Sequence, residues 1–160
     1  MKDFEELREE IIEKNIAILE KFEKYLQEKG LSDNTSYKHL SNLDFYANDY
    51  LINYGTEEDE NGNLIMPTII EGIHPNFIDH FLGNFFIRKC MWSNENTIKE
   101  NITSFKKFYT FLEKEEGLIS KKDLEELKKL IKEQKNEWIR KVNLYNDPNI
   151  DFEDIMDEFL

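Results

Sequence analysis

Residues of the types that most often perform catalysis or bind metals are few in this chain of 160 residues. The histidines are His39, His74 and His80, and none stands in an H-x-x-x-H or H-E-x-x-H arrangement. The sequence therefore predicts no zinc site, because two zinc ligands on one helix need such a spacing. The single cysteine, Cys90, lies near the C-terminal end of a predicted helix, whose dipole disfavours a thiolate. We expect Cys90 to be a buried structural residue.

Other chemical motifs are equally scarce. The chain has no P-loop, no G-x-G-x-x-G and no G-x-S-x-G. Asp59, Asn61 and Asn63 hint at a calcium loop, but Gly62 falls at loop position four instead of six, and Ile70 stands where a bidentate glutamate is required. Sequence alone cannot pair two of the 34 acidic residues across a cleft. We therefore expect a protein that is not an enzyme, without metal or cofactor.

Composition predicts a folded, all-α protein. Aromatic residues make up 13% of the chain, which argues against disorder, and 6 Gly with 3 Pro leave little material for a turn-rich β fold. The mean hydropathy is −0.68, and no apolar run approaches the roughly 18 residues that a membrane span needs. One cysteine allows no internal disulfide, and the acidic N-terminus does not read as a signal peptide. We expect a cytoplasmic protein with no membrane partner.

The spacing of apolar residues predicts six helices separated by cap and turn signals. We expect Asp3 to cap the first helix, Ser32 or Asp33 the second, and Ser93 the fourth. Ser120 and Asp123 form a capping-box-like S-x-x-D, which is expected to open the fifth helix. Residues 120–160 would form a helical extension within a single domain of residues 1–160. The helices are expected over residues 3–29, 32–54, 75–90, 94–114, 120–145 and 151–160.

One long acidic loop is predicted between the second and third helices, over residues 55–75. It contains the charge run of residues 57–60 and the turn dipeptide Asn61-Gly62. Residues 64–66 are expected to be one short extended piece before Pro67.

The overall negative charge disfavours a nucleic-acid partner, but the distribution of charge along the chain leaves a positive region. The chain carries a net charge of −13, whereas residues 76–147 sum to +2. In the helix predicted over 94–114, the stripe opposite the apolar face carries lysine, amide and hydroxyl groups, which suit phosphates or base edges. The alternative is an ordinary solvated helix face. The stripe consists of Asn96, Lys99, Thr103, Lys106 and Thr110, with Lys107 beside it.

Phe45 is the aromatic residue that helical periodicity does not explain. In the helix predicted over 32–54, the inner stripe runs from Leu40 to Tyr54, and an ideal helix projects Phe45 away from it. Phe45 is therefore a candidate anchor for a protein partner or for self-association. The alternative is that another element, such as the 55–75 loop, covers it.

Several sequence pieces share an order with a known family. They are F-E-K-Y-L at residues 22–26, G-L-S-D-N-T at 30–35, the segment from Thr97 to Leu112, and E-G-L-I at 116–119. In this order they resemble the N-terminal core-binding domain of tyrosine recombinases and phage integrases, over about residues 19–119. The resemblance implies a small SAM-like bundle of four or five helices, and for this chain, extended at both ends, we expect five to six helices.

The resemblance also implies a function. In that family the helix after G-L-S-x-x-T and the later lysine-bearing helix face duplex DNA. The chain has no H-x-x-R motif, and the 41 residues after position 119 cannot hold a catalytic domain. We therefore expect a non-catalytic module that binds double-stranded DNA weakly and salt-sensitively; the alternative is a protein-interaction module on the same fold that has lost DNA binding. The implied DNA-facing residues are Lys38, Asn42, Lys99, Thr103, Lys106 and Lys107.

Overall fold

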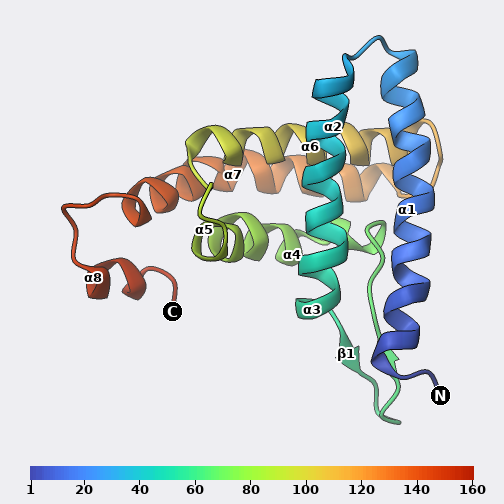
Figure 1. The fold of residues 1–160 in the computed structure, drawn as a ribbon, viewed down its shortest axis with the longest axis horizontal. Coiled ribbons are helices and arrows are strands. Elements are labelled where there is room, and N and C mark those ends of the chain that lie inside the picture. The colour runs from blue at the N-terminus through green and yellow to red at the C-terminus, as the bar shows by residue number, and fades with distance from the viewer.

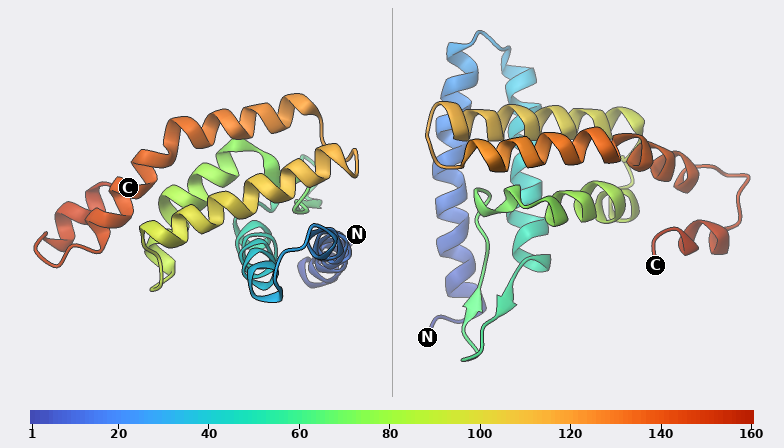
Figure 2. Two further views of the ribbon diagram at one scale, coloured as in Figure 1. Left: turned by 90° about the horizontal axis from the view of Figure 1, so that it is seen from above. Right: turned by 180° about the vertical axis from the view of Figure 1, so that it is seen from behind.

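Two helical hairpins cross each other at the centre of the molecule. The computed structural model describes all 160 residues. Helix α1 (Phe4–Glu28) and helix α2 (Asp33–Asp44) form one hairpin, and α6 (Glu95–Lys114) and α7 (Lys121–Tyr145) form the other. The hairpins cross steeply, and α6 lies between α7 and α2 (Figures 1 and 2). The expectation of an all-α bundle is confirmed.

The second and third predicted helices are each interrupted by a π-helical segment. After α2 the helical path continues through η1 (Phe45–Leu51) into α3 (Ile52–Tyr54). The third predicted helix divides into α4 (Pro75–His80), the π-helical η3 (Phe81–Phe85) and α5 (Phe86–Lys89). A π turn holds more residues than an α turn, so side chains beyond it change face. The sequence pattern, read with an ideal period, does not predict this change.

Phe45, the first residue of η1, is covered by residues from other parts of the chain. It is half-buried instead of projecting into solvent, and its ring centroid lies 6.1 Å from Phe81, 6.2 Å from Phe85 and 6.1 Å from Trp92. Another element does cover Phe45, but that element is η3 with Trp92 and not the 55–75 loop. Tyr54, expected at the end of the inner stripe, is instead 52% exposed.

The helix caps follow the sequence at three of four expected sites. Asp3, Ser32 and Ser120 each accept a hydrogen bond from a backbone N–H of the first turn that follows. The prediction for Ser93 is wrong, because Asn94 caps α6 and its side chain accepts from the backbone N–H of Thr97. Ser93 is buried, and its hydroxyl donates to the carbonyl of Ile87 3.2 Å away.

The 55–75 segment has more structure than a loop. Strands β1 (Glu57–Glu58) and β2 (Leu64–Ile65) pair antiparallel, with Glu57 opposite Ile65, and a 3₁₀ turn, η2 (Glu71–Ile73), follows. The expected turn at Gly62 is present, with a φ of +78°.

Asn15 of α1 ties this segment to the bundle. Its fully buried side chain accepts a hydrogen bond from the backbone N–H of Ile69 at 2.8 Å and donates to Asn48 at 2.8 Å. The segment is therefore fixed at its C-terminal half, away from the acidic hairpin.

A core of 32 buried residues runs from α1 to the C-terminal helix α8 (Phe152–Asp157). The predicted helix at the C-terminal end is confirmed. It returns toward α7, where Arg140 contacts Glu158 at 2.8 Å and Tyr145 packs edge-on against Phe159. No helix in the structure combines the length and the apolar character needed to cross a membrane.

Candidate nucleic-acid interface

The predicted DNA-facing lysines divide into two groups. Lys38 of α2 forms an ion pair with Glu100 of α6 at 3.2 Å, so the two helices do meet at this face. Lys99 pairs with Glu95, one turn away on the same helix, also at 3.2 Å. These two lysines are neutralised by carboxylates of their own surface.

The two polar residues of the predicted face are bonded within the molecule. The amide of Asn42 is half-buried and donates to the hydroxyl of Ser104 at 3.1 Å. The hydroxyl of Thr103 is exposed and donates to the carbonyl of Lys99 at 3.1 Å. Asn42 therefore helps to join α2 to α6, and of the two only Thr103 faces solvent.

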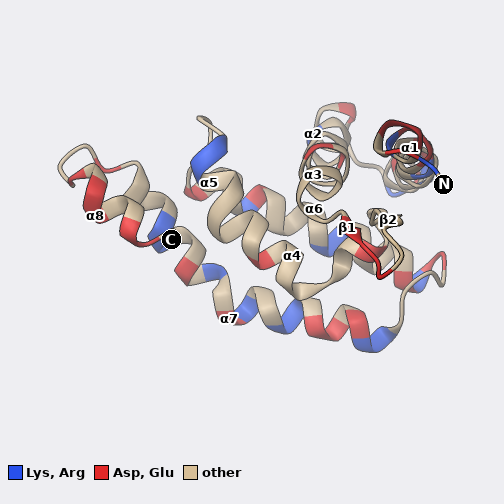
Figure 3. Cartoon of the chain, turned by 90° about the horizontal axis from the view of Figure 1, so that it is seen from below, with Lys and Arg blue, Asp and Glu red and all other residues tan.

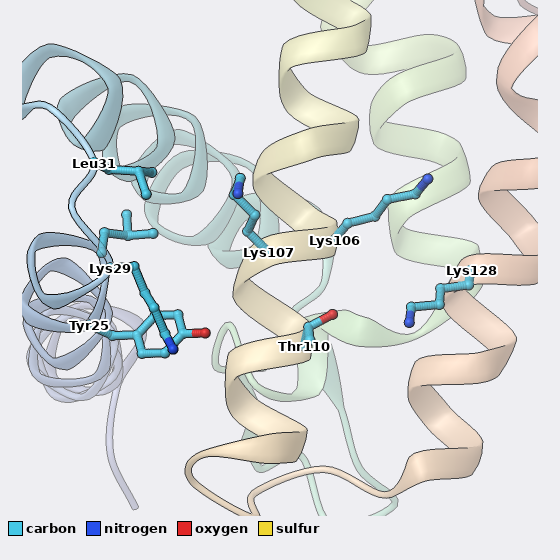
Figure 4. A pocket seen from close by; sticks show the side chains of 8 residues that line it. Tyr25, Lys29, Leu31, Lys106, Lys107, Thr110 and Lys128 are labelled. Carbon is cyan, nitrogen blue, oxygen red and sulfur yellow. The ribbon is translucent and has the colours of Figure 1, made fainter.

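Lys106 and Lys107 lie in a different environment. They line a groove of about 510 Å³ that crosses α6 between the end of α1 and the N-terminal half of α7 (Figure 4). We call this feature the lysine groove. It is lined by Tyr25, Leu26, Lys29, Leu31, Lys106, Lys107, Thr110 and Lys128.

The lysine groove has no acidic lining residue. Nine ion pairs occur in the structure, and none involves Lys29, Lys106, Lys107 or Lys128. No carboxylate oxygen thus lies within 4.0 Å of these four ammonium groups. Acidic side chains lie on β1 and α8 and also along α1 and α7, outside the groove lining (Figure 3). The groove therefore brings together four ammonium groups without an ion-pair partner in a protein of net charge −13.

Aromatic packing fixes the α1 wall of the groove against α6. The ring of Tyr25 lies 5.0 Å from that of Phe111 and 6.3 Å from that of Phe22, between centroids. The ammonium group of Lys29 lies 5.5 Å from the centroid of the Tyr25 ring, within the range of a cation–π contact. Beyond Lys29 the chain turns at Gly30, whose φ is +83°, a conformation that favours glycine.

A buried polar cluster lies behind Lys107. Ser104 donates its hydroxyl proton to the carbonyl of Glu100 at 3.0 Å and accepts from Asn42. Nδ1 of His39 lies 2.7 Å from the same hydroxyl oxygen and forms a hydrogen bond with it. Burial lowers the pKa of His39, and the charge of Lys107 lowers it further. At neutral pH the imidazole of His39 is therefore uncharged, and its pKa depends on the charge of Lys107.

A pH dependence of stability follows from this environment. Because the pKa of His39 in the folded chain lies below the unfolded value of about 6.5, the unfolded chain takes up a proton first as the pH falls. The free energy of unfolding is therefore expected to decrease as the pH drops below about 6.5, until the folded-state pKa is passed. Titration by NMR should place the pKa of His39 below the ordinary value, and His39→Gln should reduce the loss of stability on acidification. A pKa of His39 at or above 6.5 would contradict this expectation.

A second surface feature is an aromatic patch at the turn between α5 and α6. Met91 is fully exposed and Trp92 is 59% exposed. Trp92 packs edge-on against Phe45, which places the candidate partner anchor at the border of this patch. At this patch the exposed apolar groups are therefore Met91 and Trp92, which no sequence pattern distinguishes, and not Phe45.

Sequence reasoning also missed Lys29, Lys128 and Tyr25 as site residues. Lys29 reads as an ordinary basic residue at a helix end, and Lys128 is one of several lysines on α7. No local pattern separates Lys128 from Lys129, although Lys129 pairs with Glu133 and Lys128 lines the groove. Lys29, Lys128 and Tyr25 become site residues only because α1, α6 and α7 pack together around the groove.

Comparison with known protein families, with curated proteins and with solved structures finds no match for this chain.

Proposed function

We propose that this chain is a non-catalytic module that binds double-stranded DNA through the phosphate backbone. The observation that carries the proposal is the lysine groove, where four ammonium groups have no carboxylate partner. Phosphate contacts supply most of the affinity of sequence-independent DNA binding, and lysine is well suited to them. The sequence resemblance to recombinase core-binding domains supports the same partner.

Within this proposal the two lysine groups contribute differently. Lys106 and Lys107 can contact phosphates without losing an existing ion pair, whereas Lys38 and Lys99 must exchange Glu100 and Glu95 for DNA. Exposed ion pairs are worth at most about 1 kcal/mol, so this exchange is feasible but contributes less. Binding therefore centres on α6 near the groove, and α2 lies at its margin.

Salt dependence tests the proposal directly. Each phosphate neutralised by a lysine changes the slope of log K against log salt by about −0.9. With three to four phosphate contacts, we expect a slope of about −3 to −4. Fluorescence anisotropy with a labelled duplex, measured across a salt series, gives this slope. The proposal fails if no binding occurs at about 20 mM salt, where electrostatic attraction is least screened.

The second candidate function is protein interaction through Met91 and Trp92. Isolated exposed apolar residues are common on monomeric proteins. Here a methionine and a tryptophan adjoin on one turn, beside the half-buried Phe45. Tryptophan is enriched among the residues that dominate binding energy at interfaces, which is why this patch favours the second candidate.

A further inference from the structure

Duplex binding does not account for the hollow shape of the lysine groove. A duplex can be held by lysines on a flat or convex surface, since the contacts are made at ammonium groups. The groove is instead an open hollow of about 510 Å³, a volume within the range of about 300–1,000 Å³ typical of small-molecule sites. Three helices that are held together by the core form it, so its shape is already present without a ligand.

The charge of the groove favours a ligand that carries several negative charges. A phosphate monoester carries roughly −1.5 to −2 charges at neutral pH. One such group leaves about half of the charge of Lys29, Lys106, Lys107 and Lys128 unbalanced. A ligand with two or three linked phosphates matches the four lysines more closely.

The positive groups are distributed over both sides of α6. Lys106 extends from α6 toward α7, and Lys128 extends from α7 toward α6 (Figure 4). The hydroxyl of Thr110 is directed toward Lys128 and adds a neutral hydrogen-bond donor. Lys107 extends toward the turn between α1 and α2, on the other side of α6. A phosphate chain can therefore lie between α6 and α7 while the rest of the ligand reaches across α6.

The opposite side of the groove carries three apolar side chains together with Lys29, whose ammonium group lies 5.5 Å from the centroid of the Tyr25 ring. Tyr25, Leu26 and Leu31 form this wall, and the hydroxyl of Tyr25 is directed toward α6 (Figure 4). Because Tyr25 is held by Phe22 and Phe111, the wall is rigid before a ligand binds. A flat aromatic ring gains contact area on such a wall, and inorganic phosphate does not.

From this juxtaposition we infer that the lysine groove binds a nucleoside di- or triphosphate. The base lies against Tyr25 and Leu31, and the phosphates lie between Lys106 and Lys128. This inference does not depend on DNA binding. The nucleotide and the duplex would share Lys106 and Lys107, so the two ligands compete.

The first experiment measures nucleotide binding by calorimetry, with ATP as the probe, at about 20 mM salt. We expect a dissociation constant below about 1 mM for the full chain. Lys128→Gln should weaken binding about five- to tenfold, because one charge-assisted contact is lost. The matched control is Lys129→Gln, which removes the same charge from the adjacent position, and it should bind ATP like the unmodified chain. The inference is overturned if ATP does not bind, or if the two variants weaken binding equally.

The second experiment separates a nucleotide site from a general anion site. Inorganic tripolyphosphate presents the same phosphate chain without a base, and adenosine presents the base without phosphates. We expect ATP to bind more tightly than tripolyphosphate by about fivefold or more, and adenosine to bind more weakly than either, since both halves of the groove contribute. Binding of tripolyphosphate as tight as that of ATP would overturn the inference, because the apolar wall would then contribute nothing.

The same samples distinguish this inference from the proposed function. If ATP binds as expected and the duplex does not bind, the nucleotide site stands and the DNA proposal fails. If the duplex binds and ATP neither binds nor displaces it, the DNA proposal stands and the nucleotide site is rejected. Displacement of a labelled duplex by ATP, but not by adenosine, supports both.

Discussion

Reversal of two lysines in the groove, Lys106→Glu with Lys107→Glu, is expected to abolish duplex binding. Both side chains are exposed and neither forms an ion pair, so the variant should fold normally. Two of four uncompensated positive charges become negative, which leaves no net attraction for phosphate at the groove. At low salt the anisotropy titration should show a loss of affinity of at least about 100-fold, since the variant loses two phosphate contacts and gains repulsion at each.

A charge-matched control makes this result specific. Lys121→Glu with Lys122→Glu reverses two adjacent, exposed lysines at the start of α7 that do not line the groove. Both double variants change the net charge from −13 by the same amount. If the two double variants lose the same affinity for the duplex, binding depends only on the overall charge of the protein, and the groove is not the interface.

Truncation of the buried tryptophan, Trp138→Ala, is expected to cause the largest loss of stability. Trp138 is 1% exposed, and its indole N–H donates to Asp79 at 2.8 Å. It also packs so closely on η3 that a Cβ added at Gly83 would lie 2.8 Å from its ring. A cavity of this size costs about 3–5 kcal/mol. Urea unfolding monitored by circular dichroism measures this decrease in the free energy of unfolding.

The second tryptophan of the chain is the control. Trp92→Ala removes a side chain that is 59% exposed, and should cost less than about 1 kcal/mol. Equal costs for the two variants would show that Trp138 is not the core residue that we describe. Trp92→Ala also tests the protein-interaction alternative. Self-association detected by light scattering and lost in Trp92→Ala would favour that alternative, and a monomer at every concentration would count against it.

The fold class and the helix positions could be predicted because they depend on local signals. Asp3, Ser32 and Ser120 cap the helices that they precede in the sequence, and Gly30 and Gly117 end helices with positive φ. The one failed cap prediction is also local in origin. At Ser93-Asn94 two residue types that favour the cap position are adjacent, and only the hydrogen bond of Ser93 to Ile87 decides between them.

The residues of the interface could be predicted only in part from the sequence. Four of its six residues are involved in contacts that change their expected role: Lys38 and Lys99 in ion pairs, Asn42 and Thr103 in hydrogen bonds. The pairing of Lys99 with Glu95 follows a four-residue helical spacing that the sequence displays. The pairing of Lys38 with Glu100 joins residues 62 positions apart, which no local pattern reveals.

Local sequence was enough to establish an all-α chain with a lysine-bearing stripe on its central helix, since helix propensity, caps and apolar spacing act between near neighbours. Tertiary packing alone established which lysines remain without a carboxylate partner and that Lys29 and Lys128 join Lys106 and Lys107 in one groove. The physical reason is distance. The charge environment of a side chain depends on every group within several ångströms, and here those groups come from three helices separated by up to about one hundred residues of chain.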